Sequence, residues 1–129
     1  KVLEKIKKEY KMGLFMICIK GQTKEMILRD IELAQEYFDE IALKSNKTVI
    51  IDFWAPWCNP CRALLPILDE VARETDEFIV GKVNVDVEKE LAKRYKVRTV
   101  PSILVFKLGM LVKTSVGFIS KEEIYDLVK

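Results

Sequence analysis

Apolar and polar residues alternate with two different periods along this chain, and the periods predict its elements. The stretch 49–54 is apolar apart from Asp52 and predicts a buried strand over 48–54. Residues 62–75 have apolar side chains at helical spacing and predict a helix, which Pro66 should kink. Further apolar runs predict a strand at 78–85 and a hairpin of strands at 102–106 and 110–116.

The same patterns predict the remaining elements and their order. Ser120 and Glu123 have capping-box spacing at the start of the last helix. In the turn between the hairpin strands we expect Gly109 to be the only left-handed residue, because Leu108 disfavours a positive φ. From residue 25 the order is β-α-β-α-β-α-β-β-α, which predicts an α/β fold with a central mixed sheet and helices on both faces. The other expected helices span 1–11, 31–44, 87–95 and 121–128, and the other expected strands span 14–20 and 25–29.

Length and charge narrow the classes of function. With 129 residues, 50% of them hydrophobic, the chain suits one domain with a substantial core. Its net charge of +2 is small, so we expect no nucleic-acid partner. No apolar run approaches the ~18 residues of a membrane span, so we expect no membrane partner either.

Histidine is absent and there are only three cysteines. The absence of histidine excludes Ser-His-Asp and Cys-His catalysis and any His-ligated metal site. Cys18 lies in an apolar stretch, where we expect a small buried hydrophobe; a regulatory or intermolecular thiol is the alternative. One cysteine pair plus an odd thiol is typical of a reducing compartment, which predicts a cytoplasmic location.

Cys58-Asn59-Pro60-Cys61 stands where the 48–54 strand leads into the next helix. This spacing puts both sulfurs on one face of the first helical turn, close enough for a disulfide if the geometry allows. The helix N-terminus stabilises a thiolate, which is the nucleophilic form of cysteine. The alternatives are a structural thiol pair, or half of a zinc or iron–sulfur site completed by a second subunit.

A set of residues in a fixed order carries a family resemblance. These residues are Asp52-Phe53-Trp54-Ala55-Pro56-Trp57-Cys58 with Pro60-Cys61, Pro66, Lys82, Thr99-Val100-Pro101, Phe106-Lys107 with Gly109, and Val116-Gly117. By them the chain resembles the thioredoxins over residues 25–129. We therefore divide it into an N-terminal extension at 1–24, a helix plus a strand, and a thioredoxin-like domain at 25–129. The chain departs from the family in that extension and at Asn59, where the family has glycine.

The resemblance implies a protein-disulfide reductase, a thiol–disulfide oxidoreductase. Cys58 attacks the substrate disulfide and Cys61 resolves the mixed disulfide. Asp52, whose pKa burial should raise, accepts the proton of Cys61 directly or through water; a carboxylate paired to Lys82 is the alternative reading. The cycle needs no bound cofactor or metal, only protein disulfide substrates and a thioredoxin reductase-type electron donor.

The resemblance also implies a docking surface beside the cysteines. The Val100–Pro101 peptide bond should be cis, and the backbone of Val100 should pair with an extended substrate segment. For each docking residue the alternative is ordinary packing in the core. We assign Trp54 to the core. Phe118 suits docking and packing equally. The expected substrate-binding residues are Trp57, Asn59, Pro60, Thr99, Val100, Pro101 and Gly117.

Three questions have two answers each at the level of sequence. The runner-up function is a non-catalytic binding or scaffold module, such as a subunit-bridging metal or cluster site. Asn59 either donates near Cys58 and makes the pair more oxidising, or points to solvent. We expect the protein to reduce its substrates and to be a monomer. The alternative is a dimer formed through the N-terminal extension. In the monomer, the extension adds an edge strand.

Overall fold

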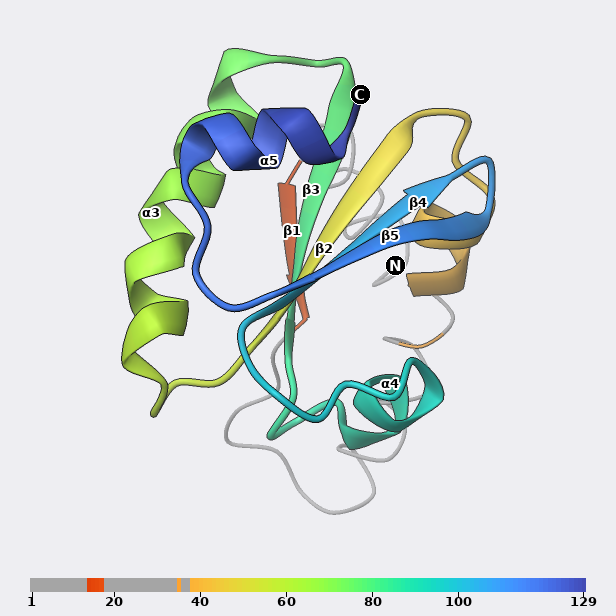
Figure 1. Cartoon of the computed structure of the whole chain (residues 1–129). Coiled ribbons are helices and arrows are strands. Elements are labelled where there is room, and N and C mark those ends of the chain that lie inside the picture. The colour runs from red at the N-terminus through yellow and green to blue at the C-terminus, as the bar shows by residue number, and fades with distance from the viewer. Residues whose placement is uncertain (1–13, 18–34, 36–37) are drawn as a thin grey trace.

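The computed structural model describes residues 14–17, 35 and 38–129 and contains one five-stranded mixed sheet (Figure 1). The strand order is β1-β3-β2-β4-β5. β1 and β2 both run parallel to β3, whereas β4 is antiparallel to β2 and β5 to β4. The bounds are β1 Leu14–Ile17, β2 Thr48–Trp54, β3 Phe78–Asn84, β4 Ser102–Lys107 and β5 Met110–Val116.

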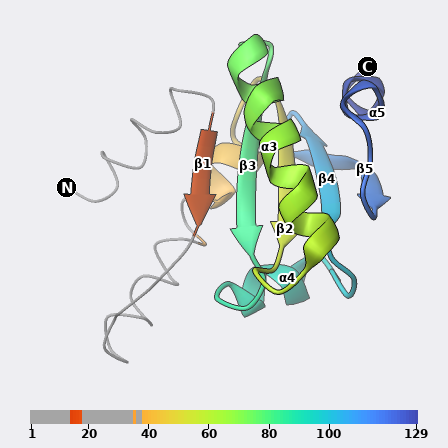
Figure 2. The same ribbon diagram turned by 90° about the vertical axis from the view of Figure 1, so that its left-hand side faces the viewer.

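Helices cover both faces of the sheet, as predicted. α3 (Asn59–Glu74) crosses one face in front of β3 and β2, and α5 (Lys121–Leu127) lies beside it (Figure 2). The opposite face packs against α4 (Lys89–Arg94) and the short π-helix η1 (Asp39–Leu43). The predicted mixed sheet between two helical layers is therefore confirmed.

The central strand β2 divides its side chains between the two layers. Val49, Ile51 and Phe53 join the core beneath η1 and α4, whereas Ile50 joins the core beneath α3 and α5. Successive strand side chains point to opposite faces, so Asp52 lies on the same face as Ile50. The carboxyl group is thus placed under α3, the helix that begins at the cysteine motif.

The element bounds follow the sequence closely. β2 spans 48–54 as predicted, and α3 begins before residue 62 because Cys58 caps it. Pro66 lies inside α3. The expected helix at 1–11, the strand at 25–29, Cys18 and residues 31–34 and 36–37 of the expected helix at 31–44 lie outside the described residues.

β1 comes from the segment that we assigned to the N-terminal extension. It pairs with β3 in register from Leu14 opposite Val80 to Ile17 opposite Val83. The extension therefore adds an edge strand, one of the roles expected for it. The boundary between residues 24 and 25 stays a prediction.

The hairpin turn between β4 and β5 differs from the prediction. Leu108 has φ 51° and Gly109 has φ 81°, so both residues are left-handed and the expectation for Leu108 was wrong. Lys107 pairs with Met110, which leaves a two-residue loop. Such loops need two positive φ angles to match the twist of the strands, and this requirement outweighs the ~1–2 kcal/mol that a left-handed leucine costs.

The last helix begins as the sequence predicts. The Ser120 hydroxyl accepts from the Glu123 amide at 3.2 Å, and the Glu123 carboxylate accepts from the Ser120 amide at 3.1 Å. This reciprocal pair satisfies two backbone donors of the first turn of α5.

Candidate active site

The cysteine motif lies at the carboxyl end of β2, where a short turn leads into α3. Cys58 is the N-cap of α3, and its Sγ accepts from the Cys61 amide at 3.2 Å. The two cysteines form a disulfide across the first helical turn, with their Cα atoms 5.2 Å apart. The predicted proximity of the two sulfurs is confirmed.

The two cysteines differ in their access to solvent. Cys58 is 6% exposed, whereas Cys61 is fully buried. Both pack with Ala55 in a small apolar cluster that also contacts Val100. Of the two cysteines, Cys58 is therefore the one with surface open to a partner molecule.

The loop before β4 faces the motif. The Val100–Pro101 peptide bond is cis, which confirms the prediction, and the Val100 carbonyl oxygen lies 3.6 Å from the Cys58 Sγ. The Ser102 hydroxyl donates to the Thr99 carbonyl at 2.5 Å and so closes the loop on the other side of the proline. The backbone next to Cys58 is held in place by these contacts.

Exposed apolar side chains lie around this loop. The Gly117 amide donates to the Pro101 carbonyl at 2.8 Å, which ties the end of β5 to the loop. Gly117 has φ 98°, a left-handed angle that favours glycine. Phe118, which follows it, is 51% exposed, and Trp57 on the motif side is 69% exposed. Pro60 is also exposed.

Trp57 is oriented by a residue that sequence reasoning missed. Its indole N–H donates to the Asp86 carboxylate at 3.0 Å, and the Asp86 amide in turn donates to the side chain of Asn84 at 2.9 Å. Asp86 follows the carboxyl end of β3. Since β3 is parallel to β2, side chains after both strands meet at one edge, and that signal was available in the sequence.

Asn59 is exposed, and its carboxamide oxygen accepts a hydrogen bond from the Arg62 guanidinium. The two residues are three positions apart, and such residues are neighbours on a helix surface. Arg62 was also missed, although that spacing could have identified it.

Asp52 is fully buried beneath α3. Neither of its carboxylate oxygens has a hydrogen-bond partner among the described residues. Burial raises the pKa of Asp52 to about 7, and the nearby charge of Lys82 opposes that rise in pKa. The carboxyl group therefore changes its protonation near neutral pH, as a proton acceptor must.

Lys82 stands opposite Asp52 in the register of β2 and β3. Its buried ammonium, however, donates to the carboxylate of Asp69 on α3. A simple ion pair between Asp52 and Lys82, the alternative reading of Asp52, is therefore not the arrangement found. Asp69 is a third residue that sequence reasoning missed.

Side chains that commonly bind metals are not clustered in the described part of the chain. Among those residues there is no group of three or more His, Cys, Asp or Glu side chains that could hold an ion. Within the same residues, no helix combines the length and apolar character needed to span a membrane.

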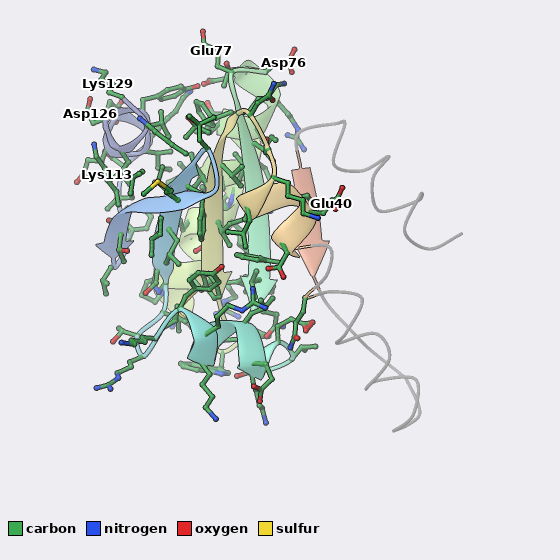
Figure 3. All side chains as sticks on the ribbon, turned by 90° about the vertical axis from the view of Figure 1, so that its right-hand side faces the viewer. Glu40, Asp76, Glu77, Lys113, Asp126 and Lys129 are labelled. Carbon is green, nitrogen blue, oxygen red and sulfur yellow. A yellow bond between two sulfur atoms is a disulfide. The ribbon has the colours of Figure 1, made fainter. Side chains whose placement is uncertain are left out.

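Several charged side chains gather at the opposite end of the sheet. Figure 3 labels Asp76 and Glu77 in the loop before β3, and Asp126 and Lys129 near the end of α5. The cysteine motif lies at the other end, after β2. The surface around Cys58 is therefore remote from these charges.

Known proteins share this arrangement. The thioredoxin family model matches residues 29–129. The chain is 42% identical over 99 residues to a thioredoxin of Buchnera aphidicola subsp. Baizongia pistaciae, covering 76% of this chain and 91% of that protein. It is also 42% identical over 85 residues to thioredoxin 1 of Synechococcus elongatus, covering 65% of this chain and 79% of that one. A solved structure of a mutant thioredoxin from Halobacterium salinarum superposes with a TM-score of 0.71 at 29% identity, covering 92% of this chain and 89% of the other.

The matched region contains strands β2 to β5, the cysteine motif and the cis-proline loop, whereas β1 precedes it. The likeness to the solved structure identifies the architecture as the thioredoxin fold. The chain thus belongs to the thioredoxin family, and it is a protein-disulfide reductase whose redox-active centre is the Cys58–Cys61 disulfide.

Proposed function

We propose that Cys58 is the attacking thiol and Cys61 the resolving thiol of this reductase. The observation that carries the assignment is the position of Cys58 at the N-cap of α3, where it is the more exposed of the two. The helix N-terminus and the Cys61 amide, 3.2 Å from the Cys58 Sγ, favour a thiolate at that position.

The exchange proceeds in two displacements. The Cys58 thiolate bonds to one sulfur of the substrate disulfide; the substrate S–S bond breaks, and its other sulfur leaves as a thiolate. Cys61 then loses its proton and attacks the Cys58 Sγ, which releases the second substrate thiolate. Two electrons have passed to the substrate, and the pair is left as the Cys58–Cys61 disulfide.

Asp52 is the proposed acceptor of the Cys61 proton, directly or through water. Support comes from the position of Asp52 on the face of the sheet that α3 covers, and from its pKa of about 7. A group with that pKa is a base strong enough to receive the proton and can lose it again at neutral pH. The charge of Lys82 moderates the pKa of Asp52.

The substrate is proposed to dock as an extended segment against the cis-proline loop. Backbone groups of Val100 are placed beside Cys58, so a strand added there brings a target disulfide to the thiolate. Exposed apolar side chains around the loop suit protein contacts. The proposed substrate-binding residues are Trp57, Asn59, Pro60, Thr99, Val100, Pro101 and Gly117.

We infer that a thioredoxin reductase-type protein re-reduces the pair. We also infer a cytoplasmic monomer, with residues 1–24 as an extension of a 25–129 domain. Cysteine usage supports the compartment. The pairing of β1 with β3 inside one chain supports the monomer, because the strand of the extension joins the sheet of its own chain.

Insulin-disulfide reduction tests the assignment of roles. Cys58→Ser should reduce turnover to the uncatalysed background, while Cys61→Ser should accumulate a mixed disulfide that is visible on a non-reducing gel. Cys18→Ser is the matched control and should keep wild-type turnover. Turnover by Cys58→Ser, or a mixed disulfide trapped on Cys61 in place of Cys58, would contradict the assignment.

A further inference from the structure

The buried lysine of the site has a partner outside the cysteine motif. The Lys82 side chain is 4% exposed, and its ammonium donates to the carboxylate of Asp69, which is 32% exposed on α3. A buried ammonium needs an acceptor, because leaving it unpaired away from water is costly. Asp69 supplies that acceptor.

A second acceptor is close to the same ammonium. Asp52 stands opposite Lys82 across the β2–β3 pairing, on the face that α3 covers, yet its oxygens have no hydrogen-bond partner among the described residues. Two carboxylates thus flank one lysine, and the lysine bonds to the more exposed one. The buried carboxyl group of Asp52, on the face that α3 covers, is left without an ion pair among the described residues.

We propose that Asp69 is a positioning residue of the redox site: by holding the ammonium of Lys82, it keeps Asp52 out of an ion pair and free to accept the Cys61 proton. This inference rests on the proposed role of Asp52. The contact of Asp69 is with Lys82, and Asp69 acts through that lysine.

The other charged groups near the site are engaged elsewhere. On α3, Glu70 and Glu74 both accept from Lys121 of α5, and Arg62 donates to Asn59. On β4, the residue opposite Asp52 is the uncharged Ile103. Among the described hydrogen bonds and ion pairs, Lys82 and Asp69 are therefore the charged pair that bears on Asp52.

Removing the charge of Asp69 should change the protonation of Asp52. Without its anionic partner, the Lys82 ammonium is drawn to Asp52 and stabilises the ionised carboxylate there. An opposite charge within bonding reach lowers the pKa of a carboxyl group by about 1–3 units. In Asp69→Asn we therefore expect the pKa of Asp52 to fall by about one unit.

The measurement is an NMR titration of the Asp52 carboxyl in oxidised, full-length protein. Asp69→Asn keeps the shape of the side chain, and Asp69→Ser is a second variant without the charge. Asp69→Glu should restore the wild-type titration. Glu70→Gln, a neighbouring charge removal on the same helix, is the matched control and should leave the titration unchanged.

A second background tests the route through Lys82. In Lys82→Met protein, adding Asp69→Asn should leave the pKa of Asp52 unchanged, because the ammonium that transmits the effect is gone. In the Lys82-containing protein, the pH profile of insulin reduction should shift to lower pH with the Asp52 titration. Asp69→Glu should return the profile to its wild-type position.

Two outcomes would overturn the proposal. One is an Asp52 titration unchanged in both Asp69→Asn and Asp69→Ser; the other is an equal shift with and without Lys82, which would make Asp69 a direct neighbour charge. Failure of the proposed function looks different. If the proposed function were wrong, Cys58→Ser would keep turnover, or Asp52→Asn would leave the resolving step unchanged. Neither result depends on how Asp52 titrates in the Asp69 variants.

Discussion

At the scale of single residues, Asn59 is the one substitution within the family's cysteine motif. Its carboxamide oxygen accepts from the Arg62 guanidinium on the exposed surface of the first turn of α3. The Cys58 sulfur instead receives the backbone amide of Cys61. This arrangement favours the solvent-facing reading of Asn59 over the reading in which its amide stabilises the thiolate.

Asn59→Gly should therefore leave the redox potential within about 10 mV of the wild-type value, measured by equilibration with glutathione. It should lower the free energy of unfolding by only about 0.1–0.3 kcal/mol, because asparagine is itself a poor helix former and glycine is slightly worse. Asn46→Gly, an exposed asparagine outside the motif, is the control. A potential that moves by about 30 mV, roughly 1.4 kcal/mol for this two-electron couple, would show that Asn59 tunes the pair.

At the scale of elements, the β4–β5 hairpin shows a local preference overridden by its context. Leucine alone disfavours a positive φ, yet Leu108 adopts 51° because the two-residue loop requires it. A Cβ added to Gly109 would run into the Leu43 carbonyl of η1. The turn thus combines a strained leucine with a position where only glycine fits.

Leu108→Asn should raise the free energy of unfolding by about 0.5–1 kcal/mol, since asparagine tolerates left-handed angles. Leu108 is 77% exposed, so little packing is lost. Chemical denaturation of the oxidised protein measures the change. The control Leu111→Asn replaces an exposed leucine of β5 and should give no gain; equal gains in both variants would rule out relief of backbone strain as the cause.

The capping box of α5 should contribute to the stability of the folded protein. Ser120→Ala removes the acceptor of the Glu123 amide and should cost about 1 kcal/mol in unfolding free energy. Ser120→Thr keeps the hydroxyl and should retain most of the stability. If the alanine and threonine variants were equally stable, the hydrogen bond would contribute nothing measurable.

At the scale of the whole molecule, Asp52 links stability to pH. Its folded pKa of about 7 lies above the ordinary value of 3.8, so the folded protein binds a proton that the unfolded chain has already released between those values. The stability contribution is therefore fully present below pH 3.8 and is lost as pH rises towards 7. The whole shift corresponds to about 4 kcal/mol.

Asp52→Asn removes this titration. Compared with the wild type, the oxidised variant should gain stability as pH rises from about 4 to about 7, by up to about 4 kcal/mol, and the gain should level off above that pH. Denaturant unfolding at several pH values measures the difference. Asp76→Asn, which removes an exposed charge at the far end of the sheet (Figure 3), is the control. A difference between wild type and Asp52→Asn that does not change with pH would contradict the buried-carboxyl assignment.

Much of this molecule follows from patterns that are local in sequence. The bounds of β2 and the capping box of α5 were predictable because hydrophobic periodicity and capping depend on residues a few positions apart. The cysteine pair was predictable for the same reason. The cis peptide bond before Pro101 rested on family resemblance, since local propensity favours trans.

The sequence by itself therefore determined the order of the elements from β2 onward, the redox pair and the burial of Asp52. Tertiary structure decided which side chains far apart in the sequence became partners. Asp86 reaches Trp57 from 29 positions away, and Asp69 rather than Asp52 takes the ammonium of Lys82. Such pairings depend on how a helix lies over a sheet. When two acceptors lie at a similar distance from one donor, packing and desolvation decide which of them accepts the hydrogen bond, and no local sequence pattern encodes that choice.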